Sequence, residues 1–255
     1  MAYRIKIPPK ELPADEAHLM SGMERLLDRL QEHRPMILVG LALLVLAAGV
    51  VGTVLWLDHR NAQQAHELLR QATQLYLDRP AGQPGKADQN LKQAIKLYTQ
   101  VADEYARAPS APFALYHLGN ALVLGNDLTG AIATYKRFIA NYGTNKILLG
   151  MVYQRLAFAY VLNGDREQAA KAFTAVLDTP GALNKDQAMF ELGKLEEAQS
   201  RPEAALAHYQ DLSKSYPQSP FAAEAAVRMK ALEVKKLPES MAPHATEASK
   251  PAEQK

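Results

Sequence analysis

The sequence predicts an all-α protein in which a single N-terminal transmembrane helix is followed by an α-solenoid of about four repeats and a C-terminal capping helix. Three observations support this prediction. An uncharged apolar run covers residues 36–57. A small residue followed four positions later by an aromatic ring then recurs at spacings of 37, 38 and 36 residues. Cysteine is absent, so a hydrophobic core and not disulfide bonds must hold the fold together.

Residues 1–35 are predicted to form a polar cytoplasmic segment with an amphipathic helix over about residues 13–33. Leucine and methionine recur there at helical spacing and fall on one face of the helix. These side chains are Leu19, Met23, Leu26, Leu27 and Leu30. Two interpretations remain open: the helix lies near the bilayer beside the membrane span, or it docks on a cytosolic partner.

Residues 36–57 are predicted to be a transmembrane signal anchor inserted in the membrane. At about 1.5 Å per residue the run forms about 33 Å of helix, which is enough to cross a hydrocarbon core about 30 Å thick. Trp56 stands where an interfacial aromatic residue belongs. A cleaved signal peptide is the alternative, but the run begins late, is longer than a signal core, and is not followed by a small-residue cleavage site.

The orientation of the span follows from the basic residues that flank it. Arg25, Arg29 and Arg34 precede the span closely, whereas Arg60 and Arg70 follow it. Because basic flanks stay preferentially on the cytoplasmic side, the N-terminus is predicted to be cytoplasmic and the following domain to be translocated.

Residues 58–233 are predicted to form the repeat domain. An apolar helical stripe continues from the span to Pro80, so the membrane helix either runs unbroken into the repeats or bends at a hinge over residues 58–61. Proline and glycine then predict a loop over residues 80–86. Residues 234–255 are rich in Ala, Pro, Glu and Lys with little apolar bulk, which predicts a disordered tail.

The recurring pairs of a small and an aromatic residue are Ala94 and Tyr98, Ala131 and Tyr135, Ala169 and Phe173, and Ala205 and Tyr209. Three pairs are preceded by a leucine and a small residue: Leu118 and Gly119, Leu156 and Ala157, and Leu192 and Gly193. The pattern resembles tetratricopeptide repeats (TPR), in which two antiparallel helices approach closely at the small residue and the ring fills the space. Spacings above the usual 34 residues predict an irregular array with long turns.

The residues that could carry chemistry do not form a recognisable catalytic or metal site. The seven histidines lack metal-ligand spacing, and the chain has no phosphate-binding glycine loop, nucleophile elbow or paired-carboxylate motif. A net charge of +2 with interleaved charges gives no patch for nucleic acid. We therefore predict a protein that is not an enzyme, uses no cofactor or metal, and does not bind nucleic acid.

The first helix of each stacked pair is predicted to line a concave face that binds a protein or peptide partner. By register this face carries Phe113, Tyr116 and Asn120, then Met151, Gln154 and Phe158, then Gln187, Phe190 and Lys194. Phe158 and Phe190 have two open interpretations, as groove rings or as core between repeats. Asn120 matches a carboxylate-clamp position of chaperone-tail-binding TPR modules, but Tyr116 stands where those modules carry lysine. Recognition of a free C-terminal carboxylate is therefore not expected.

The order of a short segment, one signal anchor and a translocated TPR domain resembles the YfgM-type ancillary subunit of the bacterial SecYEG translocon. Residues 105–116 and 215–226 also resemble envelope TPR proteins of the outer-membrane assembly and CpoB-like cell-division coordinator groups. The first resemblance implies a single-pass protein of the bacterial inner membrane whose periplasmic TPR domain binds translocon subunits, exported clients or periplasmic chaperones. A scaffold or coordinator of an envelope complex and a transmembrane signalling adaptor are the alternatives.

Overall fold

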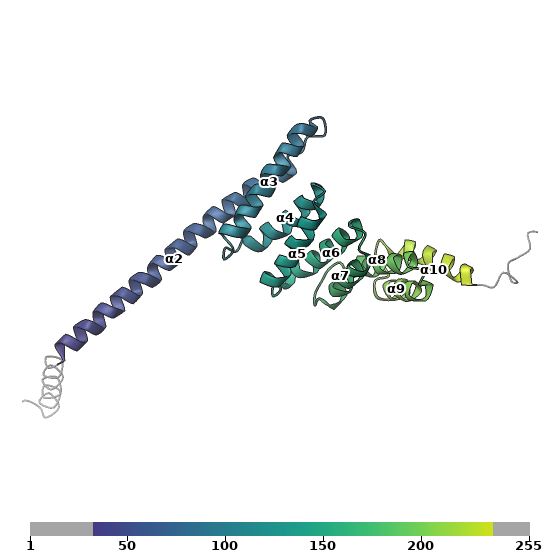
Figure 1. Cartoon of the computed structure of the whole chain (residues 1–255). Helices are drawn as coiled ribbons and strands as arrows, with labels where there is room; N and C mark the ends of the chain where they lie inside the picture. The colour runs from purple at the N-terminus through teal and green to yellow at the C-terminus, as the bar shows by residue number, and fades with distance from the viewer. Residues whose placement is uncertain (1–32, 237–255) are drawn as a thin grey trace, which may run out of the picture. The chain divides into compact units, whose positions relative to one another are not determined.

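The computed structural model describes residues 33–236, and the side chains of residues 33–234. The helix predicted over residues 13–33 and the predicted tail beyond residue 236 lie outside these ranges. Within them the chain forms nine helices and no strand (Figure 1). The helices are α2 (Arg34–Leu77), α3 (Pro84–Glu104), α4 (Ala111–Leu124), α5 (Leu128–Tyr142), α6 (Lys146–Leu162), α7 (Arg166–Asp178), α8 (Lys185–Ala198), α9 (Pro202–Ser215) and α10 (Ala222–Lys236).

The chain divides into two compact units, residues 1–60 and residues 61–255. Helix α2 contributes residues to each of them. Residues 58–61 are helical, so the structure does not contain the hinge that the sequence left open. Helix α10 continues to Lys236, so residues 234–236 are helical, although the sequence placed them in the tail.

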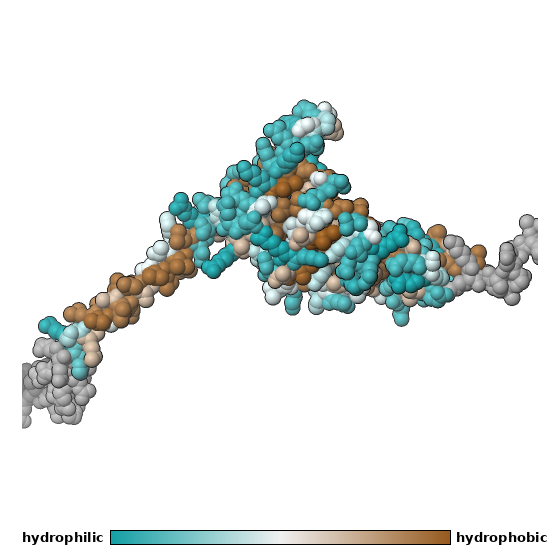
Figure 2. Space-filling model, in the orientation of Figure 1, coloured by the Kyte–Doolittle hydropathy of each residue, from teal (hydrophilic) through white to brown (hydrophobic). Residues whose placement is uncertain are grey.

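The first unit contains the apolar run, which forms one continuous helical segment of α2. An 18-residue window of this helix has a mean hydropathy of 2.7, and none of it is buried within the protein. Figure 2 shows this part of α2 as a mostly brown, apolar helix. Of the described helices, it is the only one that is long and apolar enough to cross a membrane. A helix that is apolar on all sides and is left uncovered by the described residues has the character of a membrane span.

The second unit pairs its helices as the repeat pattern predicted. Helices α3, α5, α7 and α9 each carry one small–aromatic pair, and the four rings, Tyr98, Tyr135, Phe173 and Tyr209, are fully buried. From α3 to α10 the helices follow one another along a single row (Figure 1). Helix α10 covers the last pair and buries Ala225 and Leu232 in a core that it shares with α8 and α9.

The rings pack against glycine backbone in two of the pairs. A Cβ atom added to Gly119 would lie 2.3 Å from Cε1 of Tyr135, and one added to Gly193 would lie 2.4 Å from Cε1 of Tyr209. Both distances are far below van der Waals contact, so a side chain at Gly119 or Gly193 would displace the ring from its present position. By register Ala72 and Ala157 hold the equivalent positions in the other two pairs, whose rings are Tyr98 and Phe173.

The turn between the two helices of a pair also repeats. Asn126, Gly164 and Ser200 lie at equivalent positions and have φ angles of +60°, +82° and +57°. In each case the next residue donates its backbone N–H to the carbonyl five residues earlier, at 2.9 Å, as in a Schellman helix end. The sequence did not reveal this repeat, because glycine occupies only one of the three left-handed positions.

The loop predicted over residues 80–86 is shorter in the structure, since α3 already begins at Pro84. Proline is well suited to the first helical turn, where its missing N–H has no intrahelical acceptor to lose. The side-chain amide of Asn90 closes the loop by donating to the Asp78 carbonyl at 2.6 Å. Helices α5, α7 and α9 end at Tyr142, Asp178 and Ser215, within three residues of the helix breakers Gly143, Gly181 and Pro217.

We expect Gly119→Ala to lower the free energy of unfolding by about 2 kcal/mol, because the new methyl group overpacks a fully buried ring. Gly125→Ala is the matched control, since a Cβ atom there would meet its nearest neighbour at 3.5 Å. Chemical denaturation of the full chain in detergent, followed by circular dichroism, measures both changes. Equal stability of the two variants would contradict the proposed role of the close approach.

Candidate functional site

A hollow of about 320 Å³ lies where the first helices of three consecutive pairs meet. Tyr76 of α2, Asn120 of α4 and Phe158 of α6 contribute to its wall together with the ring of Tyr135. Its remaining lining residues are Val123, Leu124, Arg155, Ala159 and Leu162. Leu124 and Leu162 are exposed, so the hollow has an apolar edge that is open to solvent.

One hydrogen bond fixes the polar part of the wall. The Tyr135 hydroxyl donates to Oδ1 of Asn120 at 2.8 Å. Burial raises the pKa of Tyr135, so the hydroxyl keeps its proton at neutral pH and remains a donor. With its oxygen held in this way, the Asn120 side chain presents its amide N–H groups as the donors still available in the hollow.

Arg155 is the only charged residue among the nine described residues that line the hollow. Desolvation lowers the pKa of its guanidinium group, but contact with the Tyr116 hydroxyl and the effects of Tyr135 and Tyr76 raise the pKa, so the net shift is upward. Arg155 forms no ion pair with any carboxylate of the described residues. A positive charge therefore stands in the hollow without an anionic partner from the described chain.

A larger hollow of about 680 Å³ between α7 and α8 has a different character. Its cations are already paired with its own carboxylates: Lys171 with Glu167 at 2.6 Å, and Arg201 with Glu196 at 2.6 Å. Charges that neutralise each other leave little attraction for a charged ligand. Among the described residues, no group of three or more His, Cys, Asp or Glu side chains could hold a metal ion. The smaller hollow is therefore the stronger candidate.

The structure places the nine predicted groove residues in different environments. Phe113 and Met151 are 44% and 40% exposed, and Asn120 and Phe158 line the hollow. Tyr116 is buried, with 8% of its surface exposed. The amide of Gln154 donates to Oε1 of Gln187 at 2.6 Å, which links α6 to α8.

Phe158 and Phe190 belong to the packed interior. Phe158 meets Phe173 edge to face at a centroid distance of 5.2 Å, although one side of its ring still lines the hollow. Phe190 is only 3% exposed and stacks on Phe221 at 5.3 Å, directly before α10. Of the two open interpretations, core packing therefore holds for Phe190, while Phe158 combines both.

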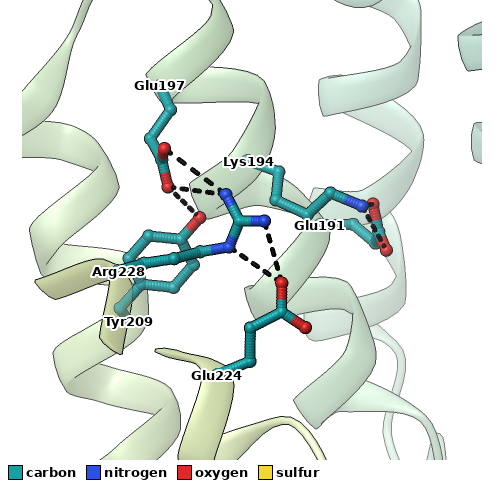
Figure 3. Close-up of polar contacts among 6 residues, drawn as sticks. All are labelled: Glu191, Lys194, Glu197, Tyr209, Glu224 and Arg228. Atoms are coloured by element: carbon teal, nitrogen blue, oxygen red, sulfur yellow. Dashed lines mark hydrogen bonds and ion pairs between the residues drawn. The ribbon is translucent and has the colours of Figure 1, made fainter. Parts of the chain in front are cut away.

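Polar contacts fasten α10 beside Phe190 (Figure 3). Arg228 pairs with Glu224 on its own helix at 2.8 Å and with Glu197 of α8 at 3.4 Å. Tyr209 of α9 donates its hydroxyl to the same Glu197 carboxylate. Burial and this hydrogen bond raise the pKa of Tyr209. Lys194, the last predicted groove residue, is held by Glu191 at 2.9 Å. Arg228 therefore links α10 to α8, whereas the Lys194 pair lies within α8.

The sequence analysis missed Tyr76, Arg155, Leu124 and Leu162. Leu124 and Leu162 lie one helical turn beyond Asn120 and Phe158 on the same face, so extending the predicted stripe by four residues would have found them. Tyr76 could be found only by aligning the first helix pair with the others. In this alignment Ala72 and Thr73 take the places of Gly119 and Asn120. The Tyr98 hydroxyl donates to Thr73 Oγ1 at 3.1 Å, which establishes this equivalence.

The comparison with protein families identifies the repeats. The family model for the tetratricopeptide repeat matches residues 86–146 and residues 155–220. These residues form tetratricopeptide repeats. The match places α3 to α9 in the family and agrees with the helix pairing in the structure. Domains of this family bind protein or peptide partners. A search among curated protein sequences found no significant match.

Solved structures with similar folds are also TPR proteins. A tetratricopeptide repeat protein from Parabacteroides merdae superposes with a TM-score of 0.55 at 15% identity, over 68% of this chain and 61% of that protein. The present chain thus spans about three fifths of that protein's length. YrrB, described as a TPR protein with an unusual peptide-binding site, has a TM-score of 0.46 at 17% identity, over 59% of this chain and 71% of that one. The TPR domain of Arabidopsis OM64 has a TM-score of 0.41 at 23% identity, over 50% of this chain and 98% of that one.

We expect Phe190→Ala to lower the free energy of unfolding of the TPR domain by about 3 kcal/mol, because the substitution leaves a cavity beneath α10. Phe113→Ala is the matched comparison on a ring of the same size that is largely exposed, and it should cost less than about 1 kcal/mol. Chemical denaturation of the two full-length variants in detergent measures the difference. A Phe190→Ala variant as stable as the wild type would contradict the core assignment.

Proposed function

We propose that this chain is a membrane-anchored TPR protein that binds peptide segments of partner proteins on the face formed by its first helices. One observation carries the proposal: the face that contains Phe113, Met151 and the 320 Å³ hollow has exposed apolar side chains that no described part of the chain covers. Apolar surface on one face of stacked helices is the usual docking surface for a peptide.

The membrane anchor is residues 36–57 of α2, and residues 58–233 form the binding domain. Arginine residues before the span favour a cytoplasmic N-terminus, so the TPR domain faces the opposite side. In a bacterium this arrangement puts the protein in the inner membrane and the binding face in the periplasm. Of the nine groove residues predicted from the sequence, Phe113, Asn120, Met151 and Phe158 are best placed to reach a ligand, whereas Tyr116 and Phe190 are buried.

The specific process is an accessory role in protein translocation or in handover to periplasmic chaperones. This assignment is supported by the resemblance to the YfgM-type translocon subunit, which shares the order of short segment, signal anchor and TPR domain. Translocon subunits, exported chains and periplasmic chaperones are the partners that it implies. A scaffold of an envelope complex would use the same face, but it would hold one partner permanently.

We expect a photoreactive benzoylphenylalanine in place of Met151 to crosslink to exported chains, chaperones or translocon subunits in living cells, because this side chain is exposed on the proposed face. The control position is Gln210, which is exposed on the second helix α9. Mass spectrometry of the crosslinked bands identifies the partners. Recovery of only outer-membrane assembly or cell-division proteins, at fixed stoichiometry, would favour the scaffold over the translocation role. Equal crosslinked products from Met151 and Gln210 would refute the proposed binding face.

The orientation can be tested through the absence of cysteine in the chain. Leu183→Cys introduces a single thiol at a residue that is 99% exposed between α7 and α8. We expect a membrane-impermeant maleimide to label this variant in bacterial cells whose outer membrane has been made permeable. The cysteine-free wild type is the control. Labelling that requires lysis of the inner membrane would place the TPR domain in the cytoplasm.

A further inference from the structure

We propose that the hollow beside Arg155 recognises an internal acidic side chain of a partner peptide, with a large apolar side chain next to it in the peptide sequence. This inference rests on the proposed peptide-binding function and names the kind of segment that is bound. It follows from three properties of the hollow: its unpaired cation, its available amide donors and its apolar edge.

The charge is the first property. Arg155 lies in a wall made of Tyr, Asn, Ala, Val, Leu and Phe residues, without a carboxylate among the described lining residues. It is reachable from solvent, and it forms no ion pair within the described chain. Attraction to a carboxylate is stronger beside apolar walls than in open water, because the local dielectric constant is lower. A carboxylate is therefore the ligand group that complements this wall.

The available donors are the second property. The Tyr135 hydroxyl occupies Oδ1 of Asn120, so the Asn120 amide N–H groups are the side-chain donors that complement the guanidinium group. Arginine can contact both oxygens of a carboxylate, and an amide donor adds a further hydrogen bond. The side-chain amide of a glutamine in the ligand would accept fewer of these hydrogen bonds and would not neutralise the charge of Arg155. The hollow should therefore distinguish glutamate from glutamine.

The apolar edge is the third property. Leu124 and Leu162 are 45% and 61% exposed at the hollow. Phe113 and Met151 stand seven residues before Asn120 and Phe158, which places them on the same helical faces, two turns away. Apolar surface thus extends beyond the hollow. An internal segment of a peptide continues past the hollow and can use this surface, whereas a peptide that ends in the hollow does not need it. A volume of about 320 Å³ lies near the lower limit of about 300 Å³ for small-molecule pockets and suits one or two side chains.

The test selects displayed random twelve-residue peptides, flanked on both sides by linker, on the full-length protein in lipid nanodiscs. The wild type and Arg155→Gln are selected in parallel. Lys136→Gln is the matched control, because Lys136 is an exposed cation of α5 that contacts Tyr160 and does not line the hollow. We expect the wild type and the control to enrich Asp or Glu next to Leu, Ile, Met or Phe. The Arg155→Gln selection should retain the apolar residues and lose the acidic ones.

The tightest wild-type peptide is then measured by fluorescence anisotropy in glutamate and glutamine versions. The glutamate-to-glutamine change should weaken binding to the wild type about tenfold, as expected for a charge-assisted contact, and should leave binding to Arg155→Gln unchanged. Arg155→Glu should instead select peptides with Lys or Arg beside the apolar residue. Equal melting temperatures of the variants exclude a folding defect.

The possible results separate the two proposals. Peptides that bind equally well to the wild type and to Arg155→Gln, with no acidic preference, would overturn the acidic-segment inference and leave peptide binding intact. Selection of basic peptides by the wild type would overturn it as well. If none of the selected peptides binds the wild type, the peptide-binding function itself fails.

Discussion

The contact between an aromatic ring and a small residue in each helix pair is the constraint on which the rest of the structure depends. Tyr135 can occupy its buried position only because Gly119 has no Cβ atom. This contact sets how closely α4 and α5 approach and brings the Tyr135 hydroxyl to the neighbouring Asn120. The residue after the small one therefore belongs both to the repeat and to the wall of the hollow. The geometry of the candidate site is a direct consequence of the packing that defines the repeat.

The same position shows how packing restricts the residues available to a ligand. Thr73 and Asn120 accept hydrogen bonds from Tyr98 and Tyr135, whereas Phe158 instead meets the hydroxyl-free ring of Phe173 edge to face. The residues four positions earlier on the first helices pack between repeats and do not face a ligand. Tyr116 is buried, Gln154 donates a hydrogen bond to α8, and Phe190 lies under α10. The neighbouring positions on the first helices, which carry Phe113 and Met151 on one side and Asn120 and Phe158 on the other, remain accessible. A contiguous groove predicted from register alone thus becomes a hollow flanked by exposed apolar residues.

Local sequence patterns were enough to predict the helix pairs and the apolar span, because these depend on periodicity and on small–aromatic spacing. Pro84 was misplaced in a loop because proline both breaks helices and begins them. The left-handed turn residues were hidden because asparagine and serine replace glycine at Asn126 and Ser200. Arg155 was overlooked for a different reason. A basic residue on a helix looks ordinary in sequence, and whether it has an acidic partner is decided only by the tertiary structure.

Arg228 and Arg155 show the physical difference between an arginine that has acidic partners and one that has none among the described residues. Arg228 lies 5.7 Å from the Phe190 ring centroid and pairs with Glu197 and Glu224, so its charge is already compensated within the cap (Figure 3). Such partly exposed pairs add little stability, but they fix the orientation of α10. Arg155 has tyrosine hydroxyls as its electrostatic neighbours instead of carboxylates. Hydroxyl groups solvate a cation without neutralising it, so the charge remains available to an outside anion. For this reason we assign Arg228 to the structure of the repeat array and propose recognition for Arg155.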